Sequence, residues 1–235
     1  MIKKNYYKAS DKMSTLICDN FVLLQVLSRF GLSLGFGDQT VKEVCEKNDV
    51  DCNTFLSVVN FMISDNEFMV DTKCHISIVT LMNYLKRAHH YFLDYQLPAI
   101  RKKLVVFLEY SDNKEVSFLI LNFFDAYVEE LHNHMGYEDQ NVFTYVDKLL
   151  QGQKNLSFNI KTYAGSHNRV DTKLTELKDI IIKYLPTNGE NYDTNSMLFD
   201  FFACIQDLDY HCRIEDCIFV PAVFNLEKEL KLYEQ

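Results

Sequence analysis

The chain of 235 residues carries 33 acidic and 24 basic side chains, which gives a net charge of −9 with histidine neutral. This length allows one sizeable core plus a small accessory unit. The acidic balance argues against a nucleic-acid partner, because such partners are bound through clustered Lys and Arg. Only 7 Gly and 3 Pro occur, so turns are few and long helices are favoured.

A small helical N-terminal domain is predicted for residues 1–70. Apolar residues recur at helical spacing over 15–30 and predict the first helix. Two shorter helices follow, the first capped by Thr40 or Asp38 and the second by Asp51. A unit of this size has little core of its own, so we expect it to pack on another part of the protein.

Residues 65–76 break the helical periodicity and are the predicted linker to a second domain over 76–232. Four long helical patterns follow it, over residues 77–110, 113–150, 157–184 and 193–232. Long helices joined by short loops run antiparallel to their neighbours. The sequence therefore predicts an all-α protein, in which an up-down-up-down four-helix bundle follows the small helical domain.

The second and fourth predicted helices of the bundle share one motif, H-x-x-x-E. It occurs as His134 to Glu138 and as His211 to Glu215. Residues four apart lie one above the other on a helix face, so each motif presents an imidazole and a carboxylate in one direction.

The first and third predicted helices each add one matching histidine. The predicted metal ligands are then four histidines and two glutamates: His90, His134, Glu138, His167, His211 and Glu215. Such a set suits two iron ions in a bundle core, although imidazole and carboxylate ligands also suit manganese or zinc. We expect both glutamates to bridge the ions and the histidines to divide two to each ion, which leaves an open position for chemistry.

An acidic residue lies one helical turn from each predicted histidine ligand. These four acids are Glu130, Asp207, Asp94 and Asp171. We interpret them as hydrogen-bond acceptors for the ligand imidazoles in preference to extra ligands, with solvation as the alternative for Glu130 and Asp171. His89 and His132 are expected to point away from the ligand faces towards solvent. Tyr137 and Tyr163 are candidate proton donors near the metals, with core packing as the simpler interpretation.

Residues 88–98 place His90 seven positions before Leu97-Pro98, and each H-x-x-x-E motif is followed by an apolar segment. In these features the chain resembles the hemerythrin-like di-iron family, specifically the bacterial proteins that repair iron-sulfur clusters after damage by nitric oxide or peroxide. The resemblance selects His90 over His89. It also implies iron as the metal, as an oxo-bridged or hydroxo-bridged pair.

The N-terminal part resembles the small helical domain of the same family over residues 30–45. Well-known members carry a Cys-Cys-Gly-Gly turn there, whereas this chain has Leu34-Gly35-Phe36-Gly37. Oxygen-carrying hemerythrins use five histidines, so the predicted set of four indicates a role other than oxygen storage.

The leading hypothesis is a di-iron protein that protects or repairs iron-sulfur clusters, by iron donation or by reduction of nitric oxide. Its partners would be iron-sulfur proteins or their damaged clusters, together with nitric oxide or oxygen. An alternative is a regulatory module that senses oxygen or nitric oxide, and a third is a helical interaction protein without metal. A homodimer through the N-terminal domain is also considered.

The seven cysteines include no C-x-x-C pair, which favours reduced thiols. No export signal is visible, and no apolar run reaches membrane-spanning length. These observations predict a cytoplasmic protein without a membrane partner.

Overall fold

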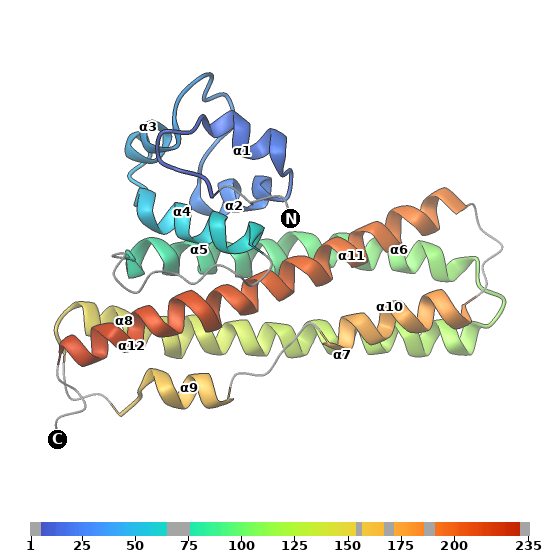
Figure 1. The fold of residues 1–235 in the computed structure, drawn as a ribbon. Coiled ribbons are helices and arrows are strands. Elements are labelled where there is room, and N and C mark those ends of the chain that lie inside the picture. Colours follow the sequence, from blue (N-terminus) through green and yellow to red (C-terminus); the bar gives the residue numbers. More distant parts are fainter. Residues whose placement is uncertain (1–5, 65–75, 154–156, 167–171, 186–190, 231–235) are drawn as a thin grey trace. The chain divides into compact units, whose positions relative to one another are not determined.

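The computed structural model describes residues 6–64, 76–153, 157–166, 172–185 and 191–230. Within these ranges every regular element is a helix (Figure 1), so the predicted all-α class is confirmed. The chain forms two compact units. The first comprises residues 1–88, 152–155 and 213–235, and the second, which holds most of the bundle, comprises residues 89–151 and 156–212.

The N-terminal part contains four short helices: α1 (Met13–Asp19), α2 (Leu23–Phe30), α3 (Val41–Lys47) and α4 (Cys52–Ile63). The single helix predicted over 15–30 is therefore wrong, because the chain turns between α1 and α2. The Asn20 side chain accepts the backbone N–H of Val22 at 3.2 Å, which is a local hydrogen bond that competes with helix continuation. Gly31 ends α2 at φ 73°, a conformation that favours glycine.

Polar caps start the next two helices as the sequence predicts. Thr40 and Glu43 form a capping box at the start of α3, and these hydrogen bonds lower the pKa of Glu43. Asp51 accepts the backbone N–H of Thr54 at the start of α4. Asp38, the other candidate cap, pairs instead with Lys12 at 2.7 Å.

Aromatic contacts form the core of the first unit. The ring of Phe30 lies 5.2 Å from that of Phe55 and 4.8 Å from that of Tyr84. Phe55 and Tyr84 are both fully buried. All of the predicted linker except Ile76 lies outside the described residues, so the division into domains 1–70 and 76–232 stays a prediction.

Three of the long helical segments each contain a five-residue π-helix. These segments are α5 (Ile78–Tyr91), η1 (Phe92–Gln96) and α6 (Leu97–Glu109); α7 (Lys114–Tyr137), η2 (Glu138–Val142) and α8 (Phe143–Leu150); and α11 (Asn191–Ile214), η3 (Glu215–Phe219) and α12 (Val220–Glu229). The helices α9 (Ile160–Ser166) and α10 (Thr172–Tyr184) lie between the second and third of these segments in the chain.

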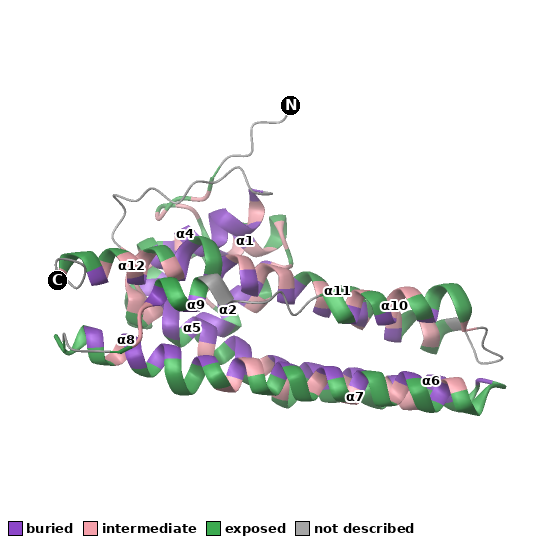
Figure 2. Ribbon diagram, turned by 90° about the horizontal axis from the view of Figure 1, so that it is seen from below, coloured by how far each residue is buried: buried purple, intermediate pink, exposed green. Residues whose placement is uncertain are grey.

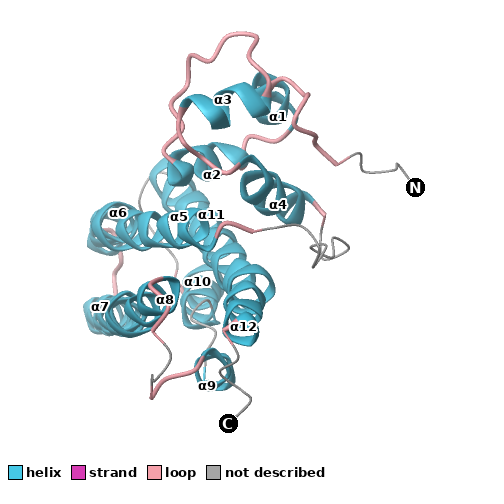
Figure 3. Ribbon diagram, turned by 90° about the vertical axis from the view of Figure 1, so that its left-hand side faces the viewer, coloured by secondary structure: helices cyan, strands magenta, loops and turns pink. Residues whose placement is uncertain are grey.

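In the second unit, α6, α7, α10 and α11 lie side by side (Figures 1 and 3). Ion pairs identify the neighbours. Arg101 of α6 binds Asp125 of α7 through two bonds of 2.7 Å. Lys103 of α6 binds Asp200 of α11 at 2.6 Å. Lys173 of α10 binds Glu130 of α7, which completes the arrangement. The predicted bundle is thereby confirmed.

The core faces of these helices follow the helical period. Buried, intermediate and exposed positions alternate along α6, α7, α10 and α11 (Figure 2), as amphipathic helices require. Phe124 of α7 meets Phe201 of α11 in this core, with ring centroids 6.1 Å apart. None of the helices in the described ranges combines the length and apolarity needed to span a membrane.

Candidate metal centre

Four buried side chains form a group that can hold a metal ion. They are His89 near the end of α5, Glu138 at the start of η2, His211 in α11 and Glu215 at the start of η3. Each offers one ligand atom, and these atoms all lie within 4.8 Å of one another. Each of the four residues is at most 1% exposed, so solvent is excluded from the group.

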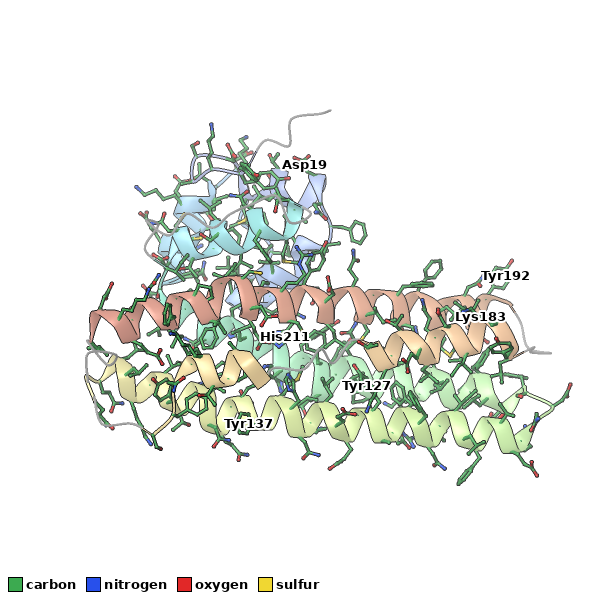
Figure 4. All side chains as sticks on the ribbon, turned by 60° about the horizontal axis from the view of Figure 1, so that its bottom comes forward. Asp19, Tyr127, Tyr137, Lys183, Tyr192 and His211 are labelled. Atoms are coloured by element: carbon green, nitrogen blue, oxygen red, sulfur yellow. The ribbon has the colours of Figure 1, made fainter. Side chains whose placement is uncertain are left out.

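The core stripe of each helix explains why these donors point inward. In α11 the buried residues recur as Met197, Phe201, Cys204 and Leu208, and His211 continues the same spacing of three and four. In Figure 4, His211 lies among the helices of the bundle. Glu215 then lies one turn further along the same continuous helical segment.

Glu138 has contacts on both of its carboxylate oxygens. Its Oε2 lies 3.3 Å from Nε2 of His89, and its Oε1 lies 3.2 Å from Nε2 of His134. The hydroxyl of Tyr163, on α9, donates a hydrogen bond of 2.5 Å to Oε1. The two oxygens therefore face histidines that belong to different helices.

The ring of His89 is oriented by its second nitrogen. Nδ1 lies 3.0 Å from Oδ1 of Asp139. Because an ionised carboxylate only accepts hydrogen bonds, the proton of the imidazole belongs on Nδ1 and the lone pair of Nε2 is the one that can bind a metal. A carboxylate behind the imidazole is the usual support of a metal-binding histidine.

Ring contacts hold the two buried histidines in place. The centroid of the His211 ring lies 5.0 Å from that of His89 and 5.7 Å from that of Phe92. The ring of His89 also stacks on that of Phe143, with centroids 5.6 Å apart. These rings fix the imidazoles and keep the group in an apolar surrounding.

Each of the three long helical segments that contribute to the group contains a π-helix. The backbone N–H of Leu97 bonds to the carbonyl of Phe92, that of Phe143 to Glu138, and that of Val220 to Glu215. Each bond spans five residues in place of four, so each turn accommodates one extra residue. Short π-helical turns inside α-helices occur frequently at functional sites.

The π-helix η1 reverses the sequence-based choice between His89 and His90. The resemblance selects His90, which lies two turns of a regular α-helix before Leu97. The extra residue accommodated in η1 gives this relation to His89, eight positions before Leu97. His89 is 1% exposed, so the expectation that it faces solvent is wrong.

His90 lies outside the group. Its side chain is 78% exposed, and its Nδ1 pairs with Oδ2 of Asp94 at 2.5 Å. Asp94 therefore accepts from the histidine one turn away, as predicted, but at the surface and away from the buried donors.

The other predicted ligands are placed as follows. The structure brings Glu138, His211 and Glu215 together. His134 is not one of the four, although it contacts Glu138 and its side chain is only 17% exposed. His167 lies outside the described residues. The ligand roles assigned to the six residues from the sequence therefore stay predictions.

The predicted acceptor acids also have separate outcomes. Glu130 pairs with Lys173, and Asp207 is buried at 8% exposure. Asp171 lies outside the described residues. The acceptor that the structure provides for His89 is Asp139, which the sequence interpretation missed because it assigned a solvent-facing role to His89.

Two prolines give a sequence signal for the irregular turns. Pro98 and Pro221 stand in the first turn of α6 and α12, directly after η1 and η3. Proline has no N–H for the preceding turn and clashes with the carbonyl four residues earlier, so it disturbs a continuous helix. The π-helix η2 has no such marker.

The two candidate tyrosines also differ. Tyr163 is 4% exposed and bonds to Glu138, whereas Tyr137 is 48% exposed and points away from the bundle (Figure 4). Of these two residues, Tyr163 is the one that reaches the donor group.

The donor set fits a metal cation. Two carboxylates and two imidazoles form a set that binds iron, manganese or zinc. Burial of Glu138 and Glu215 at 1% exposure costs free energy that a bound cation offsets. The chemistry of the group thus agrees with its geometry.

Comparison with known proteins identifies the family. The family profile described as Hemerythrin HHE cation binding domain matches residues 74–223, which is more than half of the chain and includes all four residues of the group. No curated protein matches the chain. The match confirms the hemerythrin-like part of the resemblance seen in the sequence. The chain therefore belongs to the hemerythrin HHE cation-binding family.

Proposed function

We propose that the bundle binds two iron ions, with Glu138 as the carboxylate shared between them. The observation that carries this proposal is the division of its oxygens, since Oε2 faces His89 at 3.3 Å and Oε1 faces His134 at 3.2 Å. Two donors at adjacent positions around one ion, each at about 2.1 Å, lie about 3 Å apart. Both separations are close to that value.

In this proposal the two ions have different surroundings. The residues that would hold the first are His89, His211, Glu215 and Glu138. The residues that would hold the second are His134 and Glu138, with His167 as the predicted further donor. An iron pair supplies redox chemistry and binds small diatomic molecules. The protein's own residues orient the donors and exclude water from the buried group of four.

The number of ions is tested by metal analysis of anaerobically loaded protein. We expect about two irons per chain in the natural protein and no more than about one in His89→Ala. His90→Ala is the matched control, because it removes the neighbouring but exposed histidine, and it should keep both ions. Equal loss in His89→Ala and His90→Ala would contradict the placement of the site.

The proposed role of the iron pair is protection or repair of iron-sulfur clusters, by iron donation or by nitric oxide reduction. Support comes from the family membership, from the mixed His and Glu donors, and from the resemblance of residues 30–45 to the helical domain of repair proteins. The test incubates the loaded protein with an iron-sulfur enzyme inactivated by nitric oxide. Recovery of activity that is absent with His211→Ala supports the role. Without recovery or nitric oxide consumption, the role is refuted.

A sensing role is the second candidate, and the course of α5 favours it. This helix carries His89 of the donor group and, five residues earlier, Tyr84, which contacts Phe30 of α2 at 4.8 Å. A change at the donor group therefore has a helical route to the N-terminal core. Amide hydrogen exchange of α2 and α4, measured with and without nitric oxide, tests this role, and unchanged exchange would exclude it.

A further inference from the structure

Tyr163 makes a contact that the metal-binding proposal leaves unused. It lies on α9, is 4% exposed, and donates its phenol proton to Oε1 of Glu138 at 2.5 Å. This separation is typical of a strong hydrogen bond between a hydroxyl and an ionised carboxylate. The phenol therefore binds one particular oxygen, Oε1, of Glu138, which belongs to the donor group.

The choice of oxygen determines how Glu138 is presented. Rotation about the Cγ–Cδ bond decides whether a glutamate presents both carboxylate oxygens to a single ion or one oxygen to each of two ions. Oε1 is held from the side where His134 also lies, at 3.2 Å, whereas Oε2 faces His89. The hydrogen bond from Tyr163 opposes rotation of the carboxylate group.

We propose that Tyr163 is a positioning residue, which keeps Oε1 of Glu138 on the His134 side so that this carboxylate serves both halves of the site. The inference rests on the proposed two-ion function. Loss of the hydroxyl frees the carboxylate to turn towards His89 and His211. The half of the site at His134 is then weakened, while the half at His89 and His211 keeps its donors.

The test uses Co²⁺ as the metal probe, because its visible spectrum reports the number and geometry of its ligands. The full-length protein is freed of metal with a chelator and titrated with Co²⁺ without oxygen. In the natural protein we expect two binding steps. In Tyr163→Phe the first step should persist, whereas the second should weaken by about 10- to 100-fold, the range for partners that orient metal ligands. The visible spectrum of the bound Co²⁺ should also change.

Tyr145→Phe is the matched control. Tyr145 is 5% exposed, and its ring lies 4.9 Å from that of Phe158. This variant also removes one buried hydroxyl from a tyrosine in the same unit. It should leave both steps and the Co²⁺ spectrum unchanged, so an effect seen in Tyr163→Phe alone is not due to the loss of a tyrosine hydroxyl in general. The melting temperature of each metal-free variant shows whether it is folded.

A measurement on the natural protein keeps the inference testable if Tyr163→Phe does not fold. Binding at Oε1 alters the hydrogen bond from the phenol, so the second Co²⁺ step should perturb the ultraviolet absorbance of a buried tyrosine. Fewer than two steps in the natural protein would refute the proposed function. Two steps with no tyrosine perturbation, or with identical titrations and spectra for Tyr163→Phe and the natural protein, would refute the role of Tyr163 alone.

Discussion

Residues 134–142 and 211–219 begin with the same H-x-x-x-E motif, and in both a π-helix starts at the glutamate. Their histidines nevertheless lie in different surroundings. His211 is fully buried against the rings of His89 and Phe92. The side chain of His134 is 17% exposed and contacts Glu138 of its own motif.

The core stripes of the two helices account for this difference. Leu208 and His211 follow one another at a spacing of three on the buried face of α11. In α7 the buried stripe passes from Leu131 to Met135, so His134 lies beside the stripe. A motif fixes the direction of two side chains relative to each other, whereas the neighbouring core positions decide how deeply each one is buried.

The largest effect is expected for His211→Ala. Loss of this imidazole removes a buried donor from the group of four, and metal affinity should fall by more than about 100-fold, the upper end for residues that only orient ligands. His134→Ala should keep about one ion per chain, because the donors around His211 remain. Metal analysis and titration measure both variants. Equal losses of metal in the two variants would show that the two motifs contribute equally, despite the different burial of their histidines.

The two glutamates provide the next test. Glu138→Gln should weaken both ions, because both of its oxygens face histidines, whereas Glu215→Gln should retain about one ion at His134. Glutamine keeps the size of the side chain and removes its charge, so packing is preserved. Metal content after dialysis distinguishes the variants. Retention of both ions in Glu138→Gln would refute the shared carboxylate.

A smaller effect is expected for the acids behind the histidines. Asp139→Asn weakens the support of His89 at Nδ1 and should lower metal affinity by about 10- to 100-fold. Asp94→Asn is the control, since this acid pairs with the exposed His90 and should have no effect on affinity. Competitive titration against a chelator measures both. A loss of metal affinity in Asp94→Asn but not in Asp139→Asn would indicate that His90, and not His89, is the metal ligand.

The smallest effect is expected for Thr40→Ala, which lies in neither motif segment. It removes the capping box of α3 and should lower the free energy of unfolding by about 1 kcal/mol. Denaturant unfolding measures this loss, and metal content should be unchanged. A parallel loss of metal would show that stability alone accounts for the effects of the other variants.

The fold was predictable because long helical periodicity and few turn residues leave little choice of architecture. Glu138, His211 and Glu215 were predictable because a spacing of four survives in any helix. His89 was not, because the resemblance selected the histidine seven positions before Leu97, whereas the π-helix η1 places the buried histidine eight positions before it. The break at Asn20 was also missed, because the apolar spacing over residues 15–30 gives no sign of it. There the Asn20 side chain accepts a hydrogen bond from the backbone N–H of Val22, which competes with helix continuation.

The π-helices also bear on how such a gene changes over time. In a continuous α-helix, one added codon would turn every preceding side chain by about 100° relative to those that follow. A π-helical turn accommodates that residue locally, so the donors before it and the core positions after it keep their common direction. Related chains that differ by one codon within residues 92–96, 138–142 or 215–219 would therefore retain the same donors at altered spacing, and an alignment without gaps would pair the wrong histidines.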